Sequence, residues 1–249
     1  GRHSHPEYRG KKVIISTPNN STCQDLVKAL KDVRLPAVAG GDQRGERLRV
    51  VWVVAKSWAG NIDSEAKPYT LSQAAVYPPL GYNTLPSEQQ RIRLRSMHER
   101  RDKGEHLMSQ QQEQIYRSLY KKAAREIFES ADVLVMTTTQ TALKQVREVQ
   151  TSLNLTDETG QISELDLNMI WDVPGKRCCC IGDDKQIEAR HNSQAAEKLQ
   201  LPSSFSRLKA QYGSIMLEHV FRHLLKSVSW NATYVYDGRL KSTAKRTQW

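Results

Sequence analysis

The sequence predicts an α/β protein in which parallel strands alternate with helices. Short apolar runs at 11–18, 49–57 and 131–139 have the length and composition of buried strands. Between these runs lie segments whose apolar residues recur at helical spacing. Strands that alternate with helices form parallel sheets with helices on their faces, and ligands then bind at the carboxyl ends of the strands.

The first sixty residues predict a strand, a loop, a helix and a second strand. The run "KKVIISTP" at 11–18 ends at a proline and is followed by "NNST", a cluster of residues that cap helices. The second strand is "RVVWVVAKS" at 49–57. The helix is predicted by five apolar residues at helical spacing: Cys23, Leu26, Val27, Leu30 and Val33.

Residues 59–87 are rich in Pro, Gly, Ser and Asn and predict a loop, whereas residues 87–128 predict a helical stretch. Gly104 is expected to divide this stretch into two helices. Its ten Lys and Arg against six Asp and Glu favour either a solvated surface or a regulatory or strand-contacting element. Two neighbouring stripes define its buried side: Ile115, Leu119, Ala123 and Ile127, with Tyr116, Tyr120, Ala124 and Phe128.

The rest of the chain adds further strands. "ADVLVMTTT" at 131–139 predicts a buried strand with a hydroxyl-rich end, and the segment from Ser203 predicts a helix that passes into a strand near Ile215. The run "RCCCI" contains Cys178, Cys179 and Cys180, whose adjacency does not fit a zinc site or a disulfide framework. We therefore expect a buried strand in a reducing compartment, with cysteine acting as a small hydrophobic residue.

The net charge of +10 is unevenly distributed. Residues 1–60 hold eleven Lys and Arg against five Asp and Glu, residues 129–200 hold seven against twelve, and residues 201–249 hold eight against two. An acidic middle between basic flanks is typical of a protein that binds a polyanion on one surface and a metal-bound phosphate elsewhere. The chain has no run of eighteen apolar residues, and its first ten residues lack a signal-peptide core. We expect an intracellular protein of the nucleus or cytoplasm, with no membrane partner.

Two acidic turns carry the chemistry that the sequence predicts. In "DETGQ", Asp157 and Glu158 precede Gln161, and "GDDKQ" begins 25 residues after Asp157. A carboxylate at a strand end can hold Mg²⁺, and its neighbour can polarise a water that attacks a phosphate. Asp183 and Gln186 could sense the terminal phosphate from the next strand. Turn capping is the alternative role for Asp183 and Asp184.

Read in order, the motifs resemble those of superfamily 1 helicases of the up-frameshift/senataxin type, the RNA helicases of nonsense-mediated decay and transcription termination. "VIISTPNNSTCQDLVKAL" is similar to motif Ia, and "YRSLYKKAAREIFESADVLVMTTT" to the return helix of an inserted subdomain and motif Ic. "DETGQ" resembles motif II and "GDDKQ" motif III. "SSFSRLKAQYGSIMLEHVFRHLLKSVSWNATYVYDGRL" resembles the passage into motif IV. The resemblance covers nearly the whole chain.

The resemblance implies a RecA-like parallel sheet of the P-loop NTPase type, with an inserted helical subdomain. By this interpretation, residues 1–58 are the first part of the first RecA-like domain, and residues 59–128 are the inserted loop and helices. Residues 129–214 complete the first domain with motifs Ic, II and III. Residues 215–249 begin the second domain with motif IV.

The resemblance also implies roles for the acidic turns. Asp157 would bind Mg²⁺, and Glu158 would be the general base. Gln161, Asp183 and Gln186 would sense the phosphate and couple it to the moving domain. Arg222, in "VFRH", would reach the γ-phosphate from the second domain. The implied cofactors are ATP and Mg²⁺.

The implied partner is single-stranded RNA or DNA, with RNA favoured over DNA, and a protein partner is a further possibility. In the family, short polar side chains and backbone groups grip the phosphates and sugars of the strand. The positions that match this track are Pro18, Asn19, Asn20, Thr137 and Thr138.

The sequence departs from the family at the nucleotide-binding loop. The pattern GxxxxGK[ST], whose backbone N–H groups and Lys cradle the phosphates, does not occur in the 249 residues. The strings "RGKKV" and "VPGKRC" lack the first glycine at the required spacing and the Ser or Thr after Lys. Gln24 replaces the Asp of motif Ia, "FRHLL" replaces "YRMHP", and the motifs that follow motif IV are missing. We therefore expect this chain alone to turn over ATP poorly or not at all, and its ability to bind ATP and Mg²⁺ is in doubt.

Three interpretations stay open on the sequence alone. The chain could be a piece of an ATP-dependent helicase whose P-loop lies upstream of Gly1. It could be a truncated pseudo-helicase that binds single-stranded nucleic acid or a protein partner without hydrolysis. It could also be an unrelated α/β domain whose acidic turns are structural.

Overall fold

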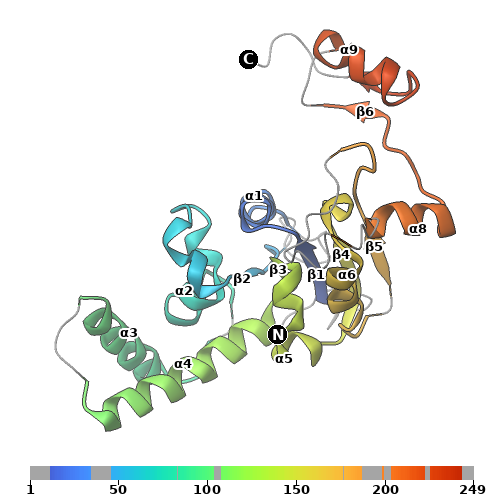
Figure 1. The fold of residues 1–249 in the computed structure, drawn as a ribbon. Coiled ribbons are helices and arrows are strands. Elements are labelled where there is room, and N and C mark those ends of the chain that lie inside the picture. The colour runs from blue at the N-terminus through green and yellow to red at the C-terminus, as the bar shows by residue number, and fades with distance from the viewer. Residues whose placement is uncertain are drawn as a thin grey trace, which may run out of the picture.

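The computed structural model describes residues 12–34, 46–82, 84–103, 108–175, 177–186, 198, 203–221 and 225–242. Its centre is a five-stranded sheet in which every strand pair is parallel, with helices on both faces (Figure 1). The order is β2-β3-β1-β4-β5. The α/β class predicted from the sequence is therefore confirmed. The strands are β1 (Lys12–Thr17), β2 (Val50–Val53), β3 (Val133–Thr137), β4 (Thr151–Thr156) and β5 (Cys178–Cys180).

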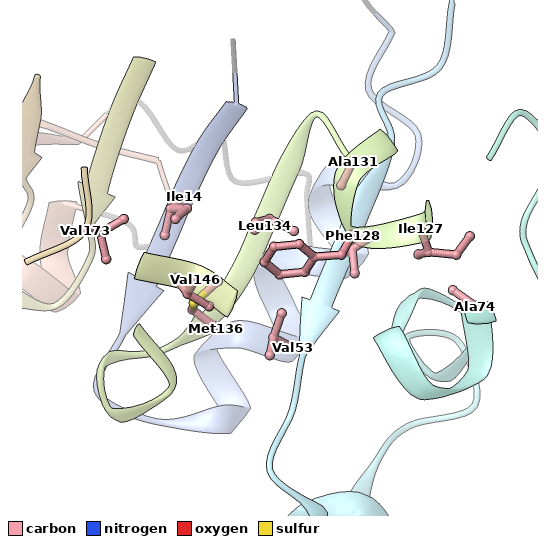
Figure 2. Packing of buried hydrophobic residues seen from close by; sticks show 11 residues of the cluster. Ile14, Val53, Ala74, Ile127, Phe128, Ala131, Leu134, Met136, Val146 and Val173 are labelled. Carbon is pink, nitrogen blue, oxygen red and sulfur yellow. The ribbon is translucent and has the colours of Figure 1, made fainter. Parts of the chain in front are cut away.

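Alternation along the strands creates two apolar layers, because successive side chains point to opposite faces of a sheet. On one face, Ile14, Leu134 and Met136 pack against Phe128 of helix α4 (Gln110–Ser130) and against helices α2 (Leu71–Val76) and α5 (Lys144–Arg147). Figure 2 shows Phe128 reaching from α4 onto the sheet beside Leu134. This layer fixes α4 on the sheet.

Helix α1 (Asn20–Leu30) covers the opposite face. Cys23 and Val27 of this helix are fully buried against Trp52 and Val135. Burial raises the pKa of the Cys23 thiol to about 11, so it packs as a small apolar side chain. The helix predicted after "NNST" is confirmed, and it begins where the Asn19 side chain caps its first turn.

A lysine of strand β1, Lys12, binds the C-terminal end of helix α4. The ammonium group of Lys12 donates to the carbonyl oxygens of Phe128 (3.1 Å) and Ala131 (2.8 Å) and also to that of Glu129. The last carbonyls of a helix have no partner within the helix, and a cation satisfies them while opposing the helix dipole. Burial lowers the pKa of Lys12. The contact ties the α4 C-terminus to the start of β1.

The predicted pair of helices between 87 and 128 is confirmed as α3 (Glu88–Asp102) and α4, while Gly104 lies outside the described residues. Helix α4 starts with a capping box in which Ser109 and Gln112 bond to each other's backbone. We call α3 and α4 together the helical arm. A separate small core holds the arm to α2: Ala75, Leu85, Leu94, Met97, Tyr116 and Ala123.

Three sequence predictions need correction. The first is the loop expected at 59–87, which contains α2 and two short 3₁₀ helices, Lys56–Asn61 and Lys67–Tyr69. Thr70 caps α2 by accepting a hydrogen bond from the backbone of Gln73. The six residues of α2 are too few to show helical periodicity, and the Pro and Gly around them predict a loop.

The second correction concerns "RCCCI". It does form strand β5, but Cys178 and Cys179 are exposed and Cys180 is half-buried. Within the described part of the chain, β5 pairs with β4 alone, so it forms an edge of the sheet. The burial expected for a parallel strand therefore does not occur. All four cysteines are free thiols.

The third correction concerns the strand expected near Ile215. Helix α8 (Ser204–Tyr212) ends at Gly213, whose φ of 75° suits a residue without a Cβ, and Ile215 is 93% exposed. The strand begins later, as β6 (His219–Val220), which pairs with β7 (Lys241–Ser242) next to helix α9 (Leu225–Tyr234). Ile215 and Leu217 are 93% and 77% exposed, so neither belongs to a buried strand. None of the helices in the described ranges is long and apolar enough to span a membrane.

Candidate functional site

The two acidic turns lie side by side at the carboxyl edge of the sheet. Asp157 and Glu158 follow β4, and Asp183 and Asp184 follow β5, which is its neighbour. The backbone N–H of Asp157 donates to the carbonyl of Ser16 (2.9 Å), so the first turn also touches the end of β1. The structure therefore brings the two acidic turns together at one edge of the sheet.

The turns touch through their backbones. The N–H of Thr159 donates to the carbonyl of Ile181 at 2.8 Å, which joins the turn after β4 to the end of β5. A Cβ on Gly160 would lie 2.5 Å from the carbonyl oxygen of Asp183, and one on Gly182 would lie 2.8 Å from the nitrogen of Gly160. Both positions therefore require glycine, since no other residue allows the two backbones to approach this closely.

Glu158 adopts a left-handed backbone conformation, with φ 54° and ψ 38°. For a residue with a Cβ this conformation costs about 1 kcal/mol. Two local hydrogen bonds hold it: the Glu158 N–H donates to Oδ1 of Asp157 (3.0 Å), and the Gln161 side chain donates to Oε2 of Glu158 (3.2 Å). The strained residue is the one that the resemblance makes the general base.

The second turn is held by side chains from the C-terminal part of the chain. The hydroxyl of Tyr236 donates to Oδ2 of Asp183 (2.5 Å), which also accepts from the Gln186 amide (2.8 Å). Lys209 of α8 pairs with Asp184 at 2.8 Å and lowers the pKa of that carboxyl. Burial, with the nearby Asp183 carboxylate, raises the pKa of Tyr236 to about 12, so it stays a hydrogen-bond donor.

The end of β1 supplies amide and hydroxyl groups. Asn19 is engaged in capping, because its Oδ1 accepts from the Thr22 backbone at 2.9 Å, whereas Oδ1 of Asn20 is buried without a hydrogen-bond partner among the described residues. A buried carbonyl oxygen without a partner is unfavourable by about 1–3 kcal/mol. Pro18 is half-buried beside them. Of the side chains at Pro18, Asn19 and Asn20, only that of Asn20 has a buried acceptor without a partner among the described residues.

The end of β3 departs in part from the sequence prediction. Thr137 and Thr138 are buried, at 6% and 4% exposure, so neither side chain is open to a ligand. Thr139 is exposed, and its hydroxyl lies 3.1 Å from that of Thr137. The accessible hydroxyl of "TTT" is therefore the third one, which sequence reasoning missed because a strand's end can be assigned only to within one or two residues.

Other site residues were either missed or cannot be placed. Arg222 lies outside the described residues. Gly160 and Gly182 could have been picked out from the sequence, because each lies inside an acidic turn. Tyr236 and Lys209 could not have been picked out, because they lie far from the turns in the sequence and only the folded chain brings them into contact with Asp183 and Asp184.

The donor set at this edge fits a magnesium ion only in part. Among the residues that the structure describes, no group of three or more His, Cys, Asp or Glu side chains could hold a metal. Mg²⁺ commonly uses one or two carboxylates and takes its other ligands from water and substrate phosphates. Asp157, half-buried at the end of β4, fits the role of that single carboxylate.

Comparison with known proteins does not add a family: no protein-family model and no curated protein matches this chain. The assignment of function therefore depends on the geometry of the carboxyl edge.

The contact between the two turns predicts a large effect of Gly160→Ala. Because the new Cβ would meet the Asp183 carbonyl at 2.5 Å, the turns must separate, and we expect the free energy of unfolding to fall by about 2–4 kcal/mol. Urea denaturation followed by circular dichroism measures the change. Gly60→Ala is the control, since nothing lies within 4 Å of a Cβ there. Equal stability of the two variants would contradict the contact.

Proposed function

We propose that this chain is part of an ATP-dependent nucleic-acid motor of the superfamily 1 helicase type, acting on single strands, with RNA favoured over DNA. The observation that supports it is the division of one sheet edge. Acidic turns lie at β4 and β5, while amide and hydroxyl groups lie at the neighbouring ends of β1 and β3. A nucleotide bound at β4 and β5 and a nucleic-acid strand bound at β1 and β3 would therefore lie next to each other, on either side of the boundary between β1 and β4.

The acidic half is suited to phosphate cleavage. Asp157 would hold Mg²⁺ together with the nucleotide's own phosphates, and the ion would neutralise phosphate charge when bound. Glu158 would accept the proton of the attacking water, with its carboxylate oriented by Gln161. Left-handed residues other than glycine concentrate at functional sites, because the surrounding structure must hold them in place. The strain at Glu158 thus supports a role in chemistry.

The other half is suited to a nucleic-acid strand. Asn20 lies in the first turn of α1, where backbone N–H groups and the helix dipole favour a phosphate. Rotation of this half-buried side chain would bring its unused Oδ1 to a ribose hydroxyl of the strand. Thr139 supplies an exposed hydroxyl from the next strand. These groups grip backbone and sugar without reading sequence.

The turn after β5 is suited to coupling. Asp183 bonds both to Gln186 in its own turn and to Tyr236, which follows α9 in a different part of the chain. Any movement of Asp183 or Gln186 toward a bound phosphate would therefore disturb the contact with residues 225–242. By the resemblance, those residues belong to the start of a second RecA-like domain, and the helical arm belongs to the inserted subdomain.

Hydrolysis by this chain alone is expected to be slow or absent. Its 249 residues contain no GxxxxGK[ST] loop, so no run of backbone N–H groups with a Lys surrounds the β- and γ-phosphates. A second candidate function is a binding module for single strands or a protein, without hydrolysis. The engagement of Asp183 by Tyr236 and of Asp184 by Lys209 favours this alternative, because neither carboxylate is free.

The Asn20→Ala variant tests the nucleic-acid half. Loss of the unused acceptor should weaken binding of a labelled single-stranded RNA about fivefold, the equivalent of one hydrogen bond. Fluorescence anisotropy measures the affinity. Asn168→Ala, at an exposed asparagine of helix α6 (Glu164–Trp171), is the matched control and should leave the affinity unchanged. An unchanged affinity in Asn20→Ala would remove Asn20 from the strand-binding site.

Glu158→Gln tests the acidic half. RNA-stimulated ATP hydrolysis would be measured for the chain and for a longer form that supplies a GxxxxGK[ST] loop, and turnover is expected in the longer form. The substitution should then lower kcat by at least about 100-fold, because the carboxylate that accepts the proton is lost. Glu126→Gln, on α4, should have no effect. Turnover that survives Glu158→Gln would exclude Glu158 as the base.

A further inference from the structure

A shallow groove of about 400 Å³ lies on the helical arm, between α3 and the start of α4. Its walls carry both apolar and cationic side chains, and none of the lining residues is acidic. The residues that matter for its chemistry are Ile92, Arg93, Ser96, Met97 and Arg100 of α3, with Gln112 of α4.

Two guanidinium groups in this groove are free to bind a ligand. Arg93 and Arg100 are exposed, and neither has an ion-pair partner within the part of the chain that the structure describes. Their neighbours are already engaged: Arg95 donates to the carbonyl of Val76, and Arg101 pairs with Glu113. Seven residues of α-helix separate Arg93 from Arg100, so both lie on one face, about 10 Å apart along the axis.

The groove also offers apolar surface beside these cations. Ile92 is 59% exposed, and the edge of the largely buried Met97 lies between the two arginines in sequence and on the same groove wall. Methionine adapts its shape to varied apolar partners. A ligand that fits must therefore combine apolar groups with two negative charges about 10 Å apart.

The groove is remote from the carboxyl edge of the sheet. Helix α4 leads into the amino end of β3, and its 21 residues span about 30 Å, so Gln112 lies far from that junction. Figure 1 shows α3 and the beginning of α4 projecting away from the sheet. A ligand here would not lie on the strand-binding groups proposed at Asn20 and Thr139.

We propose that this groove binds an acidic amphipathic helix of a partner protein. Two carboxylates seven residues apart on that helix would match Arg93 and Arg100, and apolar side chains on the same face of that helix would cover Ile92 and Met97. A third helix beside two packed helices is a common arrangement. Single-stranded nucleic acid is the weaker fit, because none of the lining residues is aromatic and bases bind such grooves by stacking on aromatic rings.

The test uses the full chain and a fluorescein-labelled synthetic helix of about 18 residues, with Glu at positions i and i+7 and Leu at i+3 and i+4. Fluorescence anisotropy should show saturable binding that weakens at least about tenfold in the double variant Arg93→Glu/Arg100→Glu. The double variant Lys121→Glu/Lys122→Glu makes the same change of charge at exposed α4 residues outside the groove, and it should weaken binding less than about twofold.

Two further readouts locate the peptide and confirm the charge pairing. The methyl NMR signal of Met97 should shift on addition of the peptide. A second peptide with Lys in place of both Glu should bind the Arg93→Glu/Arg100→Glu variant more tightly than it binds the unsubstituted chain. Circular dichroism should show both double variants folded.

Three results would overturn the proposal: no saturable binding of the acidic peptide, equal loss in both double variants, or no shift of the Met97 methyl. A labelled single-stranded RNA that loses its affinity in Arg93→Glu/Arg100→Glu, while the acidic peptide does not bind, would assign the groove to nucleic acid instead. The proposal stands apart from the proposed function. Asn20→Ala should leave peptide affinity unchanged, so either proposal can fail alone.

Discussion

The candidate site depends on one backbone contact, in which the turn after β4 lies against the turn after β5 with no side chain between them. Gly160 and Gly182 allow this approach, because a Cβ at either position would overlap a neighbouring backbone atom. The parallel pairing of β4 with β5 brings both turns to the same edge, and the glycines set their separation. Without that contact, Asp157, Glu158 and Asp183 would be acidic residues in two independent loops.

The sheet and the helices packed on it support this carboxyl edge. Alternating side chains give the sheet two apolar faces, one covered by α1 and the other by α2, α4 and α5. Lys12 joins the end of α4 to the start of β1, so the helical arm extends from the amino edge of the sheet, whereas the acidic turns lie at its carboxyl edge. The helical arm and the acidic turns therefore extend from opposite edges of the sheet.

The sequence predicted the α/β class, the buried strands β1, β2 and β3, helix α1 and the two long helices, because short apolar runs and helical spacing mark most of these elements. It failed where burial depends on neighbours: "RCCCI" is apolar, yet as an edge strand it leaves Cys178 and Cys179 exposed. It also placed the C-terminal strand too early, near Ile215. The acidic turns could be found as local patterns. The contacts of Tyr236 with Asp183 and of Lys209 with Asp184 could not, since they join distant segments.

We propose that the carboxyl edge of the sheet binds a single strand next to the acidic turns. The most direct measurement is fluorescence anisotropy of a labelled single-stranded RNA titrated with the chain at two salt concentrations. Binding through phosphates releases counterions, so we expect micromolar affinity that weakens steeply as salt rises. Absence of binding at low salt, or an affinity independent of salt, would contradict it.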